Sequence, residues 1–301
     1  MKALIFHGPG DLRLEEVPDP RPGPGDVLVQ VEVALTDGTD LKTFRRGHPL
    51  LLGKLPSPFG HEFCGLDAAT GRRVVAANSD GDLEDLQLLN GAYAELLVVP
   101  QRIARVNLHA VPEGLAPEVA ALVEPLACCL HGAERAELGG GERVAVLGAG
   151  PIGLMMCACI RDAGASPVVV GGRAERRELV PAFGGVPGEA AGADVVIDAA
   201  GTATSWGQTL GLVRRGGTVI LFSGLPRGER VAFDAYKLHY EELTVRGSFH
   251  HTPGTVRAAL AFLSSGAYPW EKLITHRVTL NEVPALFADP PGELLKAAVI
   301  P

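Results

Sequence analysis

The sequence predicts an α/β protein with two domains, one rich in β-strands and one built on a doubly wound parallel sheet. Residues 1–126 hold short runs of β-branched residues between glycine and proline clusters, which is typical of a β-rich domain. Further along, continuous apolar strands alternate with segments of helical period, which favours a parallel sheet covered on both faces. The tail returns to short strands and turns. We therefore expect one domain from residues 1–126 and 269–301, with the other inserted at 127–268.

The β-rich domain accounts for the first predicted strands, Val27–Val33, Arg73–Ala77 and Ala94–Val99. A helix is expected from Glu124 to Leu138, because apolar residues recur there at helical spacing and three glycines follow. At the end of the chain we expect one more strand, Lys296–Ile300.

The α/β domain follows the long helix with a regular alternation of strands and helices. Its predicted strands are Val144–Leu147, Val168–Val170, Val195–Asp198, Thr218–Phe222 and Leu243–Phe249. Its predicted helices are Ile152–Ala163, Ala174–Phe183 and a segment near Thr204–Leu212. Strands that are apolar throughout are buried on both faces, so this pattern indicates a parallel rather than an antiparallel sheet.

Composition excludes several classes of protein. The 301 residues carry 27 Lys and Arg against 35 Asp and Glu, a formal charge of −8, so we expect no nucleic-acid partner. No apolar run reaches the roughly 20 residues that span a bilayer, and the first residues turn polar too early for a signal peptide. Five cysteines, an odd number, argue against a secreted disulfide framework. We expect a cytoplasmic protein without a membrane partner.

A glycine-rich loop lies between a predicted strand and a predicted helix. It reads Gly148-Ala149-Gly150-Pro151-Ile152-Gly153, a GxGxxG pattern in the context that dinucleotide binding requires. Gly148 permits the tight turn, Gly150 lets the backbone approach a pyrophosphate, and Gly153 lets the helix pack close to the strand. The helix N-terminus favours negative charge, so we expect phosphates there. The alternative is a glycine-rich turn without a ligand.

The end of the next strand indicates which nicotinamide cofactor binds. An acidic residue usually stands there to hold the ribose 2′-hydroxyl, but this chain has Gly171-Gly172-Arg173, followed by Arg176 and Arg177. Without a carboxylate, a 2′-phosphate is not repelled, and guanidinium groups can bind it. We therefore expect NADP(H) to be preferred over NAD(H). The alternative is that Arg176 and Arg177 belong to a solvated helix face.

Three segments carry side chains that could bind a metal ion. These are Asp37 before Gly38, the pair His61 and Glu62, and Glu124 near the start of the long helix. Imidazole and carboxylates suit zinc, and a catalytic zinc keeps one position open for water or substrate. Each residue also has a simpler interpretation, because a lone histidine is more often structural and Asp-Gly is a common turn.

Taken together and in order, these motifs resemble the zinc-dependent medium-chain dehydrogenase/reductase superfamily, the alcohol and polyol dehydrogenases. The family pattern is Cys-Gly-Thr-Asp, Gly-His-Glu, Glu-Pro-Leu-Ala and a glycine-rich nucleotide loop. The matching segments here are Asp37–Asp40, Gly60–Glu62, Glu124–Ala127 and Gly148–Gly153, with later landmarks at Asp194–Gly201, Gly216–Val219 and Leu273–His276. The resemblance implies a GroES-like catalytic domain and a Rossmann domain, with the active site in the cleft between them.

The resemblance also implies a reaction and roles for residues. One zinc per chain would be held by Asp37 and His61, with Glu62 or Glu124 or both, and would assist hydride transfer between NADP(H) and an alcohol, polyol or sugar. Thr39 matches the family's proton-relaying hydroxyl, Lys42 is a weaker relay candidate, and Asp40 would orient His61. A homo-oligomer, dimer or tetramer, is expected. The sequence does not name the substrate.

Three departures from the family pattern stand out. Asp37 replaces the usual ligand cysteine. The site would then offer only oxygen and nitrogen donors, so that manganese or cobalt could compete with zinc. Many members of the family hold a structural zinc with four closely spaced cysteines. The corresponding stretch here, Asn78–Asn90, is short and has no cysteine, so we expect no structural zinc. The segment Gly184–Gly192 is too short for a full strand–helix unit, so one strand of the parallel sheet should be reduced.

Two other functions remain open at this point. A zinc-independent quinone or enoyl reductase of the same superfamily would lack the Asp, His and Glu set. A non-enzymatic NADP(H)-binding sensor would bind nucleotide without metal or turnover.

Overall fold

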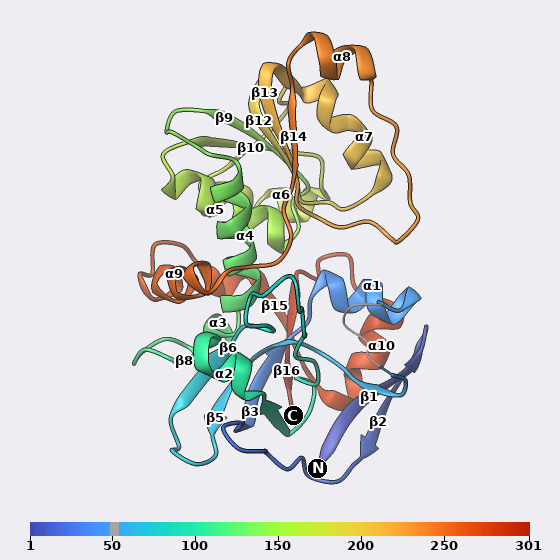
Figure 1. Ribbon diagram of the computed structural model, residues 1–301, viewed down its shortest axis with the longest axis vertical. Coiled ribbons are helices and arrows are strands. Elements are labelled where there is room, and N and C mark those ends of the chain that lie inside the picture. Colours follow the sequence, from blue (N-terminus) through green and yellow to red (C-terminus); the bar gives the residue numbers. More distant parts are fainter. Residues whose placement is uncertain (49–53) are drawn as a thin grey trace. The chain divides into compact units, whose positions relative to one another are not determined.

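The structure is a computed structural model that describes residues 1–48 and 54–301, and the chain divides into two compact units (Figure 1). Unit 1 consists of Met1–Pro125 and Thr252–Pro301, and unit 2 of Leu126–His251. The expected division at residue 268 differs from this second boundary. The reason is a helix, α9 (Pro253–Ser264), that contacts helices of unit 1. Those helices are α2 (Gln101–Asn107) and α3 (Pro117–Ala120).

Unit 1 is rich in β-structure, as the sequence predicts. A three-stranded sheet has the order β2-β1-β4, and a larger sheet runs β15-β16-β3-β5-β6-β8, with β7 also paired to β3. The strands of the small sheet are β1 (Lys2–Gly8), β2 (Asp11–Glu16) and β4 (Ser57–Pro58). Those of the large sheet are β3 (Val27–Leu35), β5 (Glu62–Asp67), β6 (Arg73–Ala76), β7 (Leu96–Val99), β8 (Leu108–Ala110), β15 (Ile274–Thr279) and β16 (Lys296–Ile300).

The core of unit 1 lies against the larger sheet. Along β3 the apolar residues Val29, Val31 and Val33 are buried while Gln30 between them is exposed, the period-two pattern of a half-covered strand. Short helices close the core, namely α1 (Gly38–Arg46) and α10 (Val283–Ala288), with 3₁₀ turns at Trp270–Leu273 and Leu280–Glu282. Aromatic rings fill it, including Phe6, Phe44, Phe59, Tyr93 and Phe287.

The two ends of the chain meet in this sheet. In Figure 1 the red strand β16 lies beside the blue strand β3, with which it pairs antiparallel. Leu35, at the end of β3, is opposite Ala298 on one side and opposite Glu62 of β5 on the other. The strand registers therefore bring the start of β16 to the start of β5, although the two strands are far apart in sequence.

Unit 2 is a six-stranded parallel sheet in the order β11-β10-β9-β12-β13-β14. Its strands are β9 (Arg143–Leu147), β10 (Ser166–Val170), β11 (Val186–Pro187), β12 (Ala193–Asp198), β13 (Val213–Leu221) and β14 (Thr244–Gly247). Dinucleotide-binding sheets have this strand order, and their ligands bind where the order reverses, which here is between β9 and β12. The expected reduced strand is confirmed, because β11 has two residues and leads directly to β12.

Helices flank the sheet of unit 2, and one predicted helix is wrong. The observed helices are α4 (Val123–Arg135), which begins at the unit boundary, α5 (Pro151–Asp162), α6 (Ala174–Arg177), α7 (Ala203–Leu212) and α8 (Ala235–Tyr240). The single helix predicted over Ala174–Phe183 is instead α6 followed by a 3₁₀ turn, Val180–Phe183. Pro181 explains the break, because its ring lacks an N–H and clashes with the preceding helical turn. Within the described residues, no helix combines the length and apolarity needed to cross a membrane.

Candidate functional site

Asp37 stands at the junction between β3 and α1. It is the N-cap of α1, and its Oδ1 accepts a hydrogen bond from the backbone N–H of Thr39. Aspartate is a preferred N-cap because its side chain satisfies one of the unpaired N–H groups of the first helical turn. Its other oxygen, Oδ2, lies 3.7 Å from Nζ of Lys296. Asp37 is therefore the helix-capping residue that the simpler interpretation expects and also a member of a charged cluster.

His61 is fixed by a buried carboxylate. Its Nδ1 lies 3.0 Å from Oδ1 of Asp40, in the first turn of α1, and both side chains are almost fully buried. The hydroxyl of Tyr93 donates to the other oxygen of Asp40, and it lies 3.1 Å from the carbonyl oxygen of Leu35. With its Nδ1–H held by Asp40, the imidazole can offer Nε2 to a metal ion once that nitrogen gives up its proton.

The residue before His61 allows this arrangement. Gly60 has a φ of 88°, and a β-carbon there would lie 2.7 Å from the ring of Tyr93. Such a contact is too short for any side chain, so the position requires glycine on both conformational and steric grounds. In the Gly-His-Glu motif, Gly60 therefore allows close packing against Tyr93, while His61 and Glu62 are candidate metal ligands.

Glu62 forms a buried ion pair that the sequence analysis did not anticipate. Nζ of Lys296, on β16, lies 2.8 Å from Oε1 and 2.6 Å from Oε2 of Glu62, and both residues are fully buried. The same ammonium donates to the carbonyl of Thr36 at 3.1 Å. A lone lysine among apolar residues in the strand Lys296–Ile300 was the available signal, because a buried charge needs a partner.

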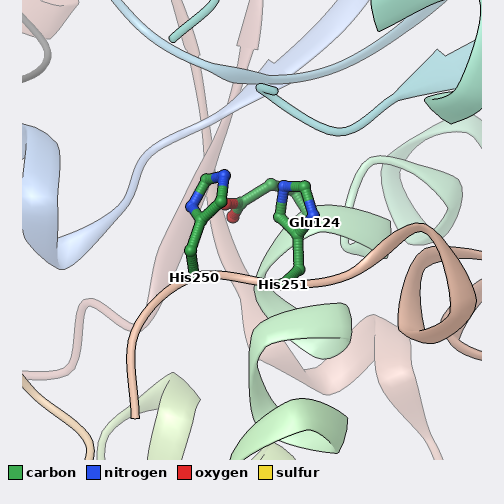
Figure 2. A group of neighbouring side chains, drawn as sticks. All are labelled: Glu124, His250 and His251. Carbon is green, nitrogen blue, oxygen red and sulfur yellow. The ribbon is translucent and has the colours of Figure 1, made fainter. Parts of the chain in front are cut away.

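Glu124 stands near the first of the two places where the chain passes between the units. It lies in the first turn of α4 and is buried. Figure 2 shows its carboxylate on α4, with His250 and His251 coming from the segment that precedes α9, at the second passage. Within unit 1, the charge of Glu124 is close enough to raise the pKa of His61.

The electrostatics of the cluster depend on burial and on its mixed charges. Burial alone lowers the pKa of His61, but the carboxylates of Asp40, Glu124 and Asp37 outweigh this and raise it to about 10. Burial likewise lowers the pKa of Lys296, and Glu62 and Asp37 reverse the shift, so that the ammonium stays charged. Burial raises the pKa of Asp37, whereas Lys296 and His61 bring it well below its usual value.

The donor set fits a divalent metal ion. Asp37, His61 and Glu62 each offer a ligand atom, and these atoms all lie within 4.8 Å of one another. One imidazole nitrogen with carboxylate oxygens is a hard donor set that suits zinc and also manganese or cobalt. Three of the four predicted ligands are thus brought together, whereas Glu124, also in unit 1, is not part of this group. Asp40 contacts His61 as expected.

The two other predicted catalytic residues lie on the same helix. Thr39 is in the first turn of α1 and contributes its backbone N–H to the cap. Lys42 follows one turn later and is half-buried. Residues three apart on a helix share a face, so Thr39 and Lys42 are neighbours on α1.

In unit 2 the glycine-rich loop has the geometry that a dinucleotide requires. Gly148 has a φ of 105°, and Gly150 is the N-cap of α5, with Pro151 at its first position. A β-carbon at Gly153 would collide with the carbonyl oxygen of Gly148, so the helix can start this close to β9 only with glycine. Gly150 brings no side chain to the start of α5, and Ile152 follows Pro151 in its first turn, where backbone N–H groups favour a phosphate.

The arginines after β10 form a positive patch. Gly171 and Gly172 follow the strand, and Arg173 is the N-cap of α6. Burial lowers the pKa of Arg176, and the charge of Arg173 lowers it further, so the two guanidinium groups are near one another. Two like charges held close together are stabilised by an anion, and a phosphate is the anion that guanidinium groups bind best.

Comparison with known proteins gives a consistent group of relatives. The family model of zinc-binding dehydrogenases matches residues 188–265. Erythritol/L-threitol dehydrogenase of Mycolicibacterium smegmatis is 30% identical, over 94% of this chain and 92% of that protein. L-galactonate-5-dehydrogenase of Escherichia coli is 29% identical, over 92% and 91% respectively.

Solved structures agree with the sequence relatives. A structure described as a putative zinc-binding dehydrogenase from Sinorhizobium meliloti, bound to NADP, is 30% identical, has a TM-score of 0.89, and is matched over 100% of this chain and 99% of that one. An alcohol dehydrogenase from Thermus sp. ATN1 is 28% identical with a TM-score of 0.85, over 100% and 99% respectively. The similarity therefore extends over both units of the fold.

Proposed function

Because this chain belongs to the zinc-dependent medium-chain dehydrogenase/reductase superfamily, we propose that it transfers a hydride between NADP(H) and an alcohol, polyol or sugar, with one catalytic zinc per chain. Its relatives make it an NAD(P)-dependent alcohol or polyol dehydrogenase. The zinc, the preference for NADP(H) and the range of substrates are the proposal. The observation that carries it is the buried cluster of Asp37, His61 and Glu62, whose ligand atoms lie within 4.8 Å of one another.

The residues of the cluster would hold the metal and keep it reactive. Zinc bound there would act as a Lewis acid that lowers the pKa of a substrate hydroxyl or polarises a carbonyl. Asp37 and His61 would bind it, with Glu62 or Glu124 completing the protein ligands. Asp40 holds the imidazole in one tautomer, which fixes its direction and raises its basicity as a ligand.

Proton movement and cofactor binding fall to other residues. We assign the hydroxyl of Thr39 to relay the substrate proton, with Lys42 as a second relay candidate on the same helix. NADP(H) would bind with its pyrophosphate at the start of α5 and its 2′-phosphate near Arg173 and Arg176. Directly after β10 stand Gly171, Gly172 and Arg173, with no acidic residue among them, which supports NADP(H), because no carboxylate at that place would repel the 2′-phosphate.

The alternatives make different predictions. A zinc-independent quinone or enoyl reductase would not need a buried set of imidazole and carboxylates, so that set speaks against it. A non-enzymatic NADP(H) sensor would bind nucleotide without metal or turnover. Purified without chelator, the protein should contain zinc and should oxidise some member of a panel of sugars, polyols and simple alcohols with NADP⁺ or NAD⁺. Nucleotide binding without metal or turnover would instead support the sensor.

We also propose that the protein is a homo-oligomer and that it acts in the cytoplasm. Strand β14 is the edge of the parallel sheet, and α8 before it exposes Tyr236 and Tyr240, whose rings lie 4.5 Å apart. An open strand edge beside exposed aromatic side chains is typical of an interface. Light scattering after size exclusion would give the number of chains, and a monomer would contradict the first proposal. The odd number of cysteines argues against a secreted disulfide framework and therefore supports a cytoplasmic location.

A further inference from the structure

Helix α1, which follows β3 in unit 1, has a positively charged surface (Figure 1). Lys42, Arg45 and Arg46 lie on this helix, whereas its acidic residue, Asp40, is buried. From residue 41 to residue 61 the sequence has no aspartate or glutamate. The whole chain has a formal charge of −8, so the positive charge of α1 is local and opposite to that of the protein.

Two of these side chains share a face of α1 with Thr39. Lys42 comes three residues after Thr39, and Arg46 comes four residues after Lys42, which are the spacings that place helical residues on one face. Arg45 precedes Arg46 by one residue and is therefore turned away from it by about 100°. With a rise of about 1.5 Å per residue, Arg46 lies roughly 10 Å along the helix axis from Thr39. A sugar chain together with an arginine side chain can cover that distance.

The chain after α1 adds a third basic side chain to this face. Gly47, with a φ of 75°, ends the helix, and His48 follows it. Burial lowers the pKa of the half-buried His48, and the charge of His61 lowers it further, with smaller contributions from Arg46 and Lys42. The imidazole of His48 is therefore near both cations and near the histidine of the candidate metal site. Lys42, Arg46 and His48 form one group, the cationic patch of α1.

The simplest alternative is that the basic residues only stabilise the helix. Arg45 and Arg46 lie in the last turn of α1, where positive charges interact favourably with the helix dipole. That role would account for the two arginines equally, but not for Lys42 in the middle of the helix or for His48 beyond its end. Among the residues that the structure describes, Arg46 is in no ion pair, so its guanidinium group can bind an external anion.

We propose that the substrate bears a negatively charged group, a carboxylate or a phosphate, which Lys42 and Arg46 bind while the reacting hydroxyl lies beside Thr39. This inference rests on the proposed function, because it takes the reaction to occur at the candidate metal site. Ammonium and guanidinium groups bind such anions through charge-assisted hydrogen bonds, and a local positive field concentrates anions at the site. The substrate class is then a sugar acid or a polyol phosphate and not a neutral polyol.

The first measurement compares matched charged and neutral compounds. The hexitols sorbitol and galactitol are assayed with NADP⁺ beside their terminal phosphates and beside the aldonates gluconate and galactonate. We expect kcat/KM for one charged class to exceed that for the neutral hexitol by about tenfold or more, and to fall as salt rises from about 0.05 to 0.5 M. The phosphate and aldonate arms distinguish the two sources of the anion. Calorimetry on the zinc- and NADP⁺-loaded protein gives the same preference as a ratio of dissociation constants, whichever compounds are oxidised.

Variants of the two neighbouring arginines test whether the cationic patch makes the contact. Arg46→Gln removes the charge that shares a face with Thr39, so the preference for the charged compound should fall by about tenfold or more, and Arg46→Lys should restore part of it. Arg45→Gln is the matched control, because it removes the same charge from the same turn of α1. It should leave the preference unchanged. Thermal unfolding of both glutamine variants shows any effect of the helix dipole separately.

Several outcomes would overturn the inference and leave the proposed function standing. One is an active protein that binds and oxidises neutral hexitols as well as their charged counterparts. Another is an equal preference in Arg45→Gln and Arg46→Gln. A third is a higher KM of Arg46→Gln for both NADP⁺ and NAD⁺ at unchanged substrate preference, since the cationic patch would then bind the pyrophosphate of the cofactor. A wild-type protein with no zinc and no turnover of any alcohol would overturn the proposed function, and the inference with it.

Discussion

The Nδ1 nitrogen of His61 lies 3.0 Å from Oδ1 of Asp40, inside the core of the β-rich unit. The second oxygen of Asp40 accepts a hydrogen bond from the hydroxyl of Tyr93, whose ring packs on Gly60. The chain His61–Asp40–Tyr93 therefore connects the candidate metal ligand to the aromatic core. Because each member is buried, the direction of the imidazole is set by packing and not by solvent.

Removing the hydroxyl of Tyr93 should weaken the metal site without touching a ligand. In Tyr93→Phe the carboxylate of Asp40 loses a donor and cannot recruit water, which costs about 1–3 kcal/mol of folding free energy. Partners of ligand histidines typically affect metal affinity by about 10- to 100-fold, and we expect a loss of that size. Thermal unfolding and chelator competition would measure the two effects. Lower stability with unchanged zinc affinity would show that the chain does not tune His61.

Asp37 should show two separable effects, because it both caps α1 and lies in the charged cluster. Asp37→Asn keeps an N-cap side chain but removes the negative charge, so we expect zinc affinity and turnover to fall while α1 remains capped. Asp37→Ala should lose the metal and, in addition, about 0.5–2 kcal/mol of stability from the missing cap. Asp37→Cys should retain zinc through its thiolate and discriminate more strongly against manganese.

One result for Asp37→Asn would contradict its role as a metal ligand. If Asp37 is only a helix cap, Asp37→Asn will keep its full metal content and full activity. Metal analysis and steady-state kinetics on the same preparation decide between the two roles.

The preference for NADP(H) depends on Arg173. We expect Arg173→Ala to raise the KM for NADP⁺ by about 10- to 100-fold, since a hydrogen bond to a charged group contributes about 1.5–3 kcal/mol. The KM for NAD⁺ should hardly change, because NAD⁺ has no 2′-phosphate. Arg161→Ala, an exposed arginine at the end of α5, is the matched control. An equal effect of Arg173→Ala on both cofactors would contradict the assignment.

The sequence predicted the fold well where the signal was local. The strands of the parallel sheet were recognisable because runs such as Val144–Leu147 are apolar throughout, and the glycine loop fixed where the sheet begins. The helix predicted over Ala174–Phe183 was wrong because Pro181 was given too little weight. Helix α9 and the boundary near His251 were missed, because tertiary contacts decide to which unit a helix belongs.

The candidate site was predictable only in part. Asp37, His61 and Glu62 were found because each lies in a short motif. Lys296 and Tyr93 were not, because their partners are distant in sequence: Asp40 is 53 residues from Tyr93, and Glu62 is 234 residues from Lys296. One sequence without relatives contains no record of such long-range contacts.

Acidification should destabilise the protein partly through His109. This half-buried histidine of β8 has an Nε2 without a hydrogen-bond partner among the described residues, and burial, with a smaller effect of Arg257, lowers its pKa below 6.5. Below pH 6.5 the unfolded chain therefore binds a proton that the folded chain does not, and stability falls as the pH drops. His109→Leu should lose less thermal stability between pH 7.5 and 5.5 than the wild type does. An identical loss in both proteins would refute this role.

The loop at residues 79–90 should be held by arginine and not by a second metal ion. Nε of Arg102 donates to Asp80 at 2.7 Å, and its other nitrogens donate to the side chain and the carbonyl of Asp85 at 2.9 Å. Hydrogen bonds from backbone N–H groups to Ser79 and Asp82 fold the loop locally. This stretch has no cysteine to bind a structural zinc.

Two measurements on the same protein test this interpretation of the loop. Elemental analysis without chelator should approach one zinc per chain, and removing that zinc should abolish turnover while the loop stays resistant to protease. Arg102→Ala should have the reverse effect, since it breaks the ion pairs to Asp80 and Asp85 but touches no residue of the cluster around His61. Cleavage within residues 79–90 should then become faster at unchanged zinc content. Two tightly bound zinc ions, or a loop that becomes protease-sensitive on chelation, would show that a metal ion and not Arg102 holds this segment.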